Sequence, residues 1–124
     1  MSGLPATLQV LGRSLEEQGK PIEAEAAFRE GIAVEEVIPR ERAELLEDLA
    51  ALYITRGRPV EAEPLLRESV AILEQAAEQD SSHIARARNQ LGRCLDSLGR
   101  SAEAEGLFAR ARLIQQAQGA TPDH

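Results

Sequence analysis

A segment of ten residues occurs three times in this chain of 124 residues. GKPIEAEAAF begins at Gly19, GRPVEAEPLL at Gly57 and GRSAEAEGLF at Gly99, and the copies align without gaps. They are spaced 38 and 42 residues apart. Repetition at such a period indicates one supersecondary unit used three times, with a core formed only when the units stack.

Each unit is predicted to be a helix, a turn and a second helix. Apolar residues spaced three or four apart precede each repeated glycine and share one helical face. They are Leu8, Leu11 and Leu15; Leu46, Leu49 and Tyr53; and Leu91, Leu95 and Leu98. Each glycine is a candidate left-handed C-terminal cap, and a proline, Pro21 or Pro59, opens the second helix of the first two units.

The expected fold class is therefore all-α, with three antiparallel helix-turn-helix repeats stacked as a short right-handed α-solenoid. Helices are predicted at residues 5–18, 21–37, 40–56, 59–79, 83–98 and 101–117. The whole chain, 1–124, is expected to form a single domain with repeat units at 5–38, 43–76 and 85–118. A disordered tail is predicted from about residue 118 to residue 124.

Composition excludes several classes of partner. The 21 acidic and 14 basic residues give a net charge of −7, which argues against binding to nucleic acid or to an anionic membrane. Aromatic residues are only 2% of the chain, too few for a base-stacking platform. No apolar run is long enough for a membrane span, and the start lacks a signal-peptide pattern. We expect a cytoplasmic protein.

No catalytic site or cofactor site is predicted. The histidines, His83 in an inter-unit linker and His124 near the end, have no nucleophile fixed beside them in the sequence. The single cysteine, Cys94, cannot form an intramolecular disulfide or a multi-cysteine zinc site, and it falls on an internal position. The paired glutamates of each Glu-Ala-Glu point in different directions on a helix, so they cannot share one ligand. We therefore expect no metal and no enzymatic activity.

The repeated pattern resembles the tetratricopeptide repeat family. The family's large, small and glycine positions are matched in the first unit by Leu8, Leu11-Gly12, Leu15, Gly19, Ala24, Phe28 and Gly31, and the other two units follow the same scheme. Departures are Arg88 at a large-residue position and the absence of the usual proline near the end of each unit. The long period and the phrase EAEPLLRESVAIL are similar to the kinesin-light-chain-like subclass, with units of about 42 residues.

The resemblance implies a non-enzymatic interaction module that binds a peptide or a partner helix along the concave face formed by the first helices. Carrying over the family's groove positions predicts a binding groove that includes Gln9, Arg13, Glu44, Glu47, Arg86, Asn89 and Arg93, with Asp48 beside the two glutamates. Gln9 and Arg13 replace residues of the chaperone-type carboxylate clamp, so that ligand class is not expected. The predicted ligand has mixed charge, with a carboxylate near Arg86 and Arg93 and a basic residue near Glu44 and Glu47; the alternative is that these are simply solvated helix faces.

A second hypothesis concerns the ends of the stack. Leu107, Leu113 and Ile114 are candidates for an exposed apolar face on the last helix, which would favour end-to-end association with another copy. GATPDH at the end of the sequence also looks like an inter-unit linker, which would make the chain a segment of a longer repeat array.

Overall fold

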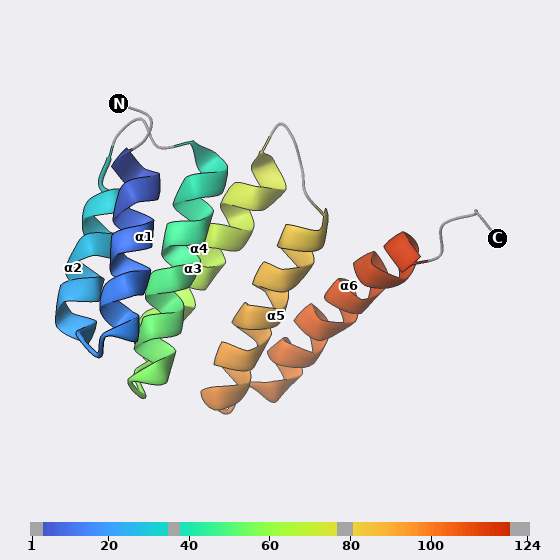
Figure 1. The fold of residues 1–124 in the computed structure, drawn as a ribbon. Coiled ribbons are helices and arrows are strands. Elements are labelled where there is room, and N and C mark those ends of the chain that lie inside the picture. The colour runs from blue at the N-terminus through green and yellow to red at the C-terminus, as the bar shows by residue number, and fades with distance from the viewer. Residues whose placement is uncertain (1–3, 35–37, 77–80, 120–124) are drawn as a thin grey trace.

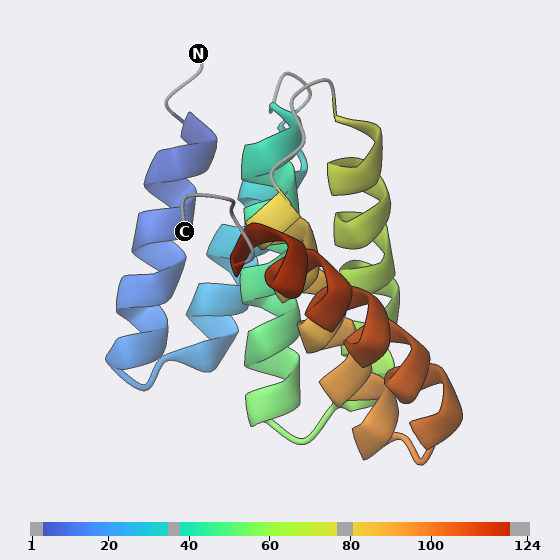
Figure 2. The same cartoon turned by 90° about the vertical axis from the view of Figure 1, so that its right-hand side faces the viewer.

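Three helix pairs lie side by side in the computed structural model, which describes residues 4–34, 38–76 and 81–119 (Figure 1). The pairs are α1 (Leu4–Glu17) with α2 (Pro21–Ile32), α3 (Pro39–Thr55) with α4 (Pro59–Gln75), and α5 (Ser81–Ser97) with α6 (Ser101–Gly119). The described residues form helices and no strands, so the all-α repeat prediction is confirmed. Figure 2 shows the stack from the end formed by the third pair, with α6 nearest the viewer.

Helix boundaries differ from the predictions chiefly at the second helices. The helix predicted to reach residue 37 ends at Ile32, and the one predicted to reach residue 79 ends at Gln75. Ile38 is extended (φ −71°, ψ 151°) because it precedes Pro39, whose ring disfavours the helical conformation there. Helix α6 runs to Gly119, beyond the predicted start of the tail, and residues 120–124 lie outside the described part of the chain.

The three repeated glycines end the first helix of each pair. Gly19, Gly57 and Gly99 have φ of 75°, 74° and 79°. In the second unit the N–H of Arg58 donates to the carbonyl of Tyr53 (2.8 Å) and that of Gly57 to Ile54 (2.9 Å), the hydrogen-bond pattern of a Schellman cap. The predicted left-handed caps are confirmed.

Replacing Gly57 with alanine is expected to lower the free energy of unfolding by about 1–2 kcal/mol, because a Cβ is disfavoured at positive φ. A Cβ at this position meets no atom within 4 Å, so the cost is conformational and not steric. Gly57→Asn should lose less, since asparagine tolerates this conformation. Urea unfolding of both variants tests the assignment, and equal losses for alanine and asparagine would argue against it.

The core runs through all three pairs and is densest in the middle one. Its fully buried large side chains come mainly from α3, with contributions from α2, α4 and α5. They include Phe28, Leu45, Leu46, Leu49, Leu52, Tyr53, Leu66 and Leu95. Because the buried residues form one cluster that spans all three pairs, no unit has a complete core by itself.

Small residues let the helices of a pair approach closely. A Cβ on Gly12 would lie 2.4 Å from Cε1 of Phe28, and one on Gly92 would lie 2.7 Å from Cε1 of Phe108. In the middle pair the corresponding positions hold Ala50 and Leu66, both fully buried. A larger residue on the first helix is thus matched by a smaller one on the second, which keeps the interhelical volume filled.

Candidate functional site

Helices α1, α3 and α5 line one face of the stack, and a cavity of about 390 Å³ opens on it. Its lining residues are Arg13, Arg40, Glu44, Glu47, Asp48, Arg86 and Gln90. Five of the eight predicted groove residues are therefore brought together around one polar cavity. Of the other three, Gln9 is hydrogen-bonded to the same cluster, Arg93 lines an adjoining cavity, and Asn89 lines neither.

The acidic residues on the α1 side of this cavity are paired within the chain. Nε2 of Gln9 donates to Oδ2 of Asp48 (2.9 Å), and Nε of Arg13 donates to the same oxygen (3.0 Å). This hydrogen bond raises the pKa of Arg13. One turn earlier on α3, Glu44 forms an ion pair with Arg40 (3.5 Å). The first and second units are thus joined by a polar network that already satisfies Asp48 and Glu44.

Glu47 forms the floor of the cavity and is held by two other helices. Its side chain is buried, with 6% of the residue exposed. The hydroxyl of Ser69 on α4 donates to Oε2 (2.6 Å), and Nε2 of His83 on α5 lies 2.9 Å from the same oxygen. The predicted basic ligand residue near Glu47 would have to compete with these partners, because the Glu47 carboxylate is already hydrogen-bonded at the meeting point of α3, α4 and α5.

His83 lies elsewhere than predicted. Helix α5 begins at Ser81, two residues earlier than expected, so His83 belongs to the first turn of the helix and not to a linker. Only 2% of it is exposed. The apolar pattern of α5, extended back from Leu91 by whole turns, passes through Ala87 and Ile84. That pattern was the signal that could have placed His83 on the buried side.

Two arginines on the α5 side of the face are not held in ion pairs by any described residue, unlike the acidic residues above. Arg86 lines the polar cavity, and Arg93, two turns later on the same helix, lines the next one. Both are exposed. Neither has an ion pair with any residue in the described ranges 4–34, 38–76 and 81–119. They are the basic groups of this face that remain available to an external carboxylate.

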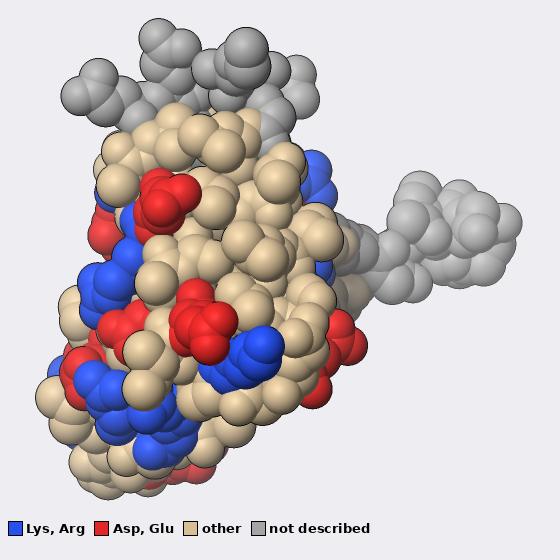
Figure 3. All heavy atoms as spheres, turned by 60° about the vertical axis from the view of Figure 1, so that its left-hand side comes forward, with Lys and Arg blue, Asp and Glu red and all other residues tan. Residues whose placement is uncertain are grey.

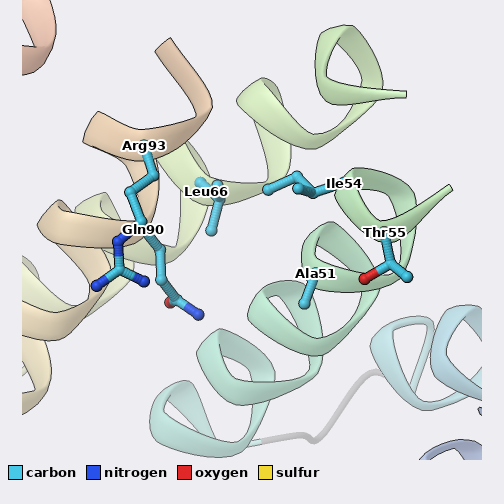
Figure 4. A pocket seen from close by; sticks show the side chains of 6 residues that line it. All are labelled: Ala51, Ile54, Thr55, Leu66, Gln90 and Arg93. Carbon is cyan, nitrogen blue, oxygen red and sulfur yellow. The ribbon is translucent and has the colours of Figure 1, made fainter. Parts of the chain in front are cut away.

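A second cavity of about 220 Å³ adjoins the first and is mostly apolar. Figure 4 shows Ala51, Ile54 and Thr55 of α3 on one side, Gln90 and Arg93 of α5 on the other, and Leu66 of α4 between them. Gln90 lines both cavities, and its amide oxygen is buried with no hydrogen-bond partner in the part of the chain that the structure describes. Sequence reasoning missed Gln90, since the corresponding residues Val10 and Asp48 suggest no shared role.

The other polar residues show structural roles. Cys94 is fully buried, its thiol donates to the carbonyl of Pro59 (3.2 Å), and burial raises the pKa of that thiol. In the Glu-Ala-Glu segments, Glu63 accepts from Arg100 of the next unit (2.8 Å). Among the described residues, no three His, Cys, Asp or Glu side chains are grouped to hold a metal ion. None of the described helices is long and apolar enough to cross a bilayer.

Family models support the assignment of the repeats. A tetratricopeptide repeat model matches residues 41–117, and a second tetratricopeptide repeat model matches residues 5–30. The first match alone covers more than half of the chain. The chain belongs to the tetratricopeptide repeat family. The family predicted from the repeated segments is thus confirmed.

Several solved structures have the same fold. BtubC (BKLC) from P. vanneervenii superposes with a TM-score of 0.87 at 17% identity, over 97% of this chain and 50% of that one. Nearly identical repeats of a putative kinesin light chain from Podospora anserina, in a single-residue variant, match at a TM-score of 0.79 and 23% identity, over 100% of this chain and 61% of that one. The latter agrees with the predicted kinesin-light-chain-like subclass.

The second tetratricopeptide repeat domain of Spaghetti (RPAP3), solved with the HSP90 peptide SRMEEVD, is also similar. Its TM-score is 0.72 at 22% identity, and the match covers 90% of this chain and 92% of that one. The present chain spans only half the length of BtubC and about three fifths of the fungal repeat protein. No curated protein sequence matches significantly.

Proposed function

We propose that this tetratricopeptide repeat protein is a non-enzymatic interaction module that binds an acidic peptide or partner helix along the face formed by α1, α3 and α5. The observation that carries the proposal is that the carboxylates of the polar cavity are paired within the chain, whereas two arginines of the same face form no ion pair with any described residue. The three carboxylates that line the polar cavity of this face, Glu44, Glu47 and Asp48, are each bound by side chains of the same chain. Arg86 and Arg93 are exposed beside two cavities.

This distribution favours one half of the predicted mixed-charge ligand over the other. A basic ligand residue near Glu44 or Glu47 would have to displace Arg40 or the buried His83, and would gain little in exchange. A ligand carboxylate beside Arg86 or Arg93 displaces only water and gains a charge-assisted hydrogen bond. The proposed ligand is therefore acidic where it crosses α5.

The second cavity supplies an apolar contact beside Arg93. Ile54 and Leu66 form its wall and floor, so an apolar ligand side chain placed there is removed from water. The amide oxygen of Gln90 is an acceptor with no partner among the described residues, and a backbone N–H of the ligand would satisfy it. A ligand with an apolar residue flanked by acidic ones fits both features.

The peptide bound to the second repeat domain of Spaghetti, SRMEEVD, itself combines acidic residues with a valine and a methionine. This supports a peptide ligand for the present face. It does not extend to the mode of binding, because Gln9 and Arg13 stand where the chaperone-type clamp has other residues.

Probing a random peptide array with the labelled protein tests the proposal. Acidic peptides with an apolar residue are expected to be enriched among the bound sequences, and binding should weaken as salt concentration rises. Replacing Arg86 and Arg93 by alanine should lower the affinity for an enriched peptide by at least about tenfold, from the loss of two charge-assisted hydrogen bonds.

The matched control replaces Arg110 and Arg112, two exposed arginines of α6, by alanine. It removes the same charge from a different face, so it should change the affinity by less than about twofold. Equal losses for the two double variants would mean that only net charge matters, and the proposed site would be wrong. Enrichment of basic peptides would contradict the proposed ligand chemistry.

A further inference from the structure

The outer face of α1 carries the same apolar position that is buried between units elsewhere in the repeat. Leu11 has two counterparts in the repeat, Leu49 and Leu91, which are 0% and 2% exposed because a preceding helix pair covers them. Leu11 is 47% exposed, and no helix of the described ranges lies on it. Leu4 on the same face is equally exposed. Much of the surface on this side of the stack is uncharged (Figure 3).

The outer face of α6 carries the positions that meet a following unit elsewhere in the repeat. Phe108 remains partly exposed, whereas its counterparts Phe28 and Leu66, which have a following pair beside them, are fully buried. Arg112 stands where Val70 is buried. The predicted candidates for this end behave differently from one another: Leu113 is exposed, and Leu107 and Ile114 are partly buried against the core.

The charges at the two outer faces are complementary in the register of the repeat. The second glutamate of each Glu-Ala-Glu accepts hydrogen bonds from the following unit: Glu25 from Tyr53 (2.7 Å), and Glu63 from Arg100 (2.8 Å). The third such glutamate, Glu105, is exposed with no ion pair in the described ranges.

Lys20 completes the pattern from the other end of the stack. It is the counterpart of Arg100, and like Glu105 it is exposed without an ion pair to any described residue. An acceptor at one end and a cation at the other therefore occupy the two positions that Glu63 and Arg100 fill at the junction of the second and third units. At the first junction the corresponding Arg58 pairs with Glu61 of its own unit.

We infer that the α6 face of one copy of this chain docks on the α1 face of a second copy, so that Glu105 meets the second copy's Lys20 and Phe108 covers its Leu11. The net charge of residues 1–38 is −4 and that of residues 81–124 is +2, so a head-to-tail arrangement also brings oppositely charged ends together. Such a contact is heterologous and does not close on itself, so assembly continues beyond two copies.

Arg112 and Gln115 occupy positions where Val70 and Leu73 are buried at the interior junction. The contact between copies is consequently more polar than the junctions within one copy. It is expected to be weaker and to be reversible on dilution.

Sedimentation velocity or light scattering over a wide concentration range tests the inference. The average mass should rise with concentration beyond that of two chains, and the rise should be smaller at high salt. Lys20→Glu or Glu105→Lys alone should weaken association by roughly fivefold, from loss of the ion pair and the like-charge contact. The double variant, which restores opposite charges, should recover it. Leu11→Gln should weaken association by at least about tenfold.

Two controls separate a specific contact from general surface effects. Ile22 on α2 is 73% exposed, more than Leu11, and Ile22→Gln should leave association unchanged. Glu30→Lys makes the same charge change as Glu105→Lys at an exposed site on α2, and by itself it should leave association unchanged. Combined with Lys20→Glu, it should not restore the association that Lys20→Glu weakens. A monomer at every concentration would overturn the inference. So would an effect of Ile22→Gln equal to that of Leu11→Gln, or a failure of the charge swap to restore assembly.

Discussion

Replacing Glu47 with alanine is expected to lower the free energy of unfolding by about 3–5 kcal/mol, the usual cost of removing one member of a buried polar pair. The change leaves the hydroxyl of Ser69 and the ring N–H of His83 without their shared acceptor in a site where neither reaches water. Because these groups lie on α4 and α5, the loss falls on the packing of the second unit against the third.

Denaturant unfolding measures this loss, with Glu44→Ala as the matched control. Glu44 lies one turn from Glu47 on the same helix, but it is partly exposed and its ion pair with Arg40 is at the surface. Its replacement should cost no more than about 1 kcal/mol. Similar losses for the two variants would contradict the assigned role of Glu47.

A second variant distinguishes the hydrogen bonds from the packing. Glu47→Gln keeps the shape and one acceptor oxygen, so it should lose less than Glu47→Ala. Replacing Glu47 and His83 together by leucine should cost less than the sum of the single changes, since no buried partner of that pair is then left unsatisfied. Additive losses would mean that the two residues do not interact.

Replacing Gly12 with alanine is expected to lower the free energy of unfolding by about 1–3 kcal/mol, through overpacking against Phe28. The added Cβ would lie 2.4 Å from the Phe28 ring, which is fully buried, so the ring or the helix must shift. Intrinsic helix propensity alone predicts the opposite sign, a gain of roughly 1 kcal/mol for alanine over glycine. The direction of the change therefore decides between the two effects.

The middle unit suggests how this loss can be reversed. It has Ala50 and Leu66 at the two positions, so Phe28→Leu combined with Gly12→Ala reproduces a pair that the same fold already accommodates. A double-mutant cycle should show a favourable coupling of about 0.5–3 kcal/mol. Gly106→Ala is the control, because a Cβ there meets no atom within 4 Å and should stabilise α6 by roughly 0.5–1 kcal/mol. A stabilising Gly12→Ala would contradict the close approach.

Much of the fold could be predicted from the sequence because its determinants are local and repeated. The apolar spacing around Leu46, Leu49 and Tyr53 places one side of α3 inside, and glycine at position 57 ends the helix because it adopts a positive φ. Each signal appears three times, so the period could be found without knowing any contact. The ends of α2 and α4 were less predictable, since the sequence continues with helix-forming residues beyond Ile32 and Gln75.

The candidate site could be predicted only in part. The face that carries Arg13, Glu44, Asp48 and Arg86 followed from the family's groove positions, and the structure gathers these residues around one cavity. What the sequence did not reveal is which charged side chains are already paired within the chain. Glu44 and Glu47 look equivalent in the sequence, yet one is at the surface and the other is buried beneath His83.

The sequence by itself determined the helical repeat, its turns and the alternation of large and small residues, because each depends on neighbours within one or two helical turns. Only the tertiary structure decided the chemistry of the face. Gln9 and Asp48 are 39 residues apart in the chain, and His83 and Glu47 are 36 apart. Whether such side chains meet depends on how one helix pair is set against the next, and helical periodicity carries no information about that angle.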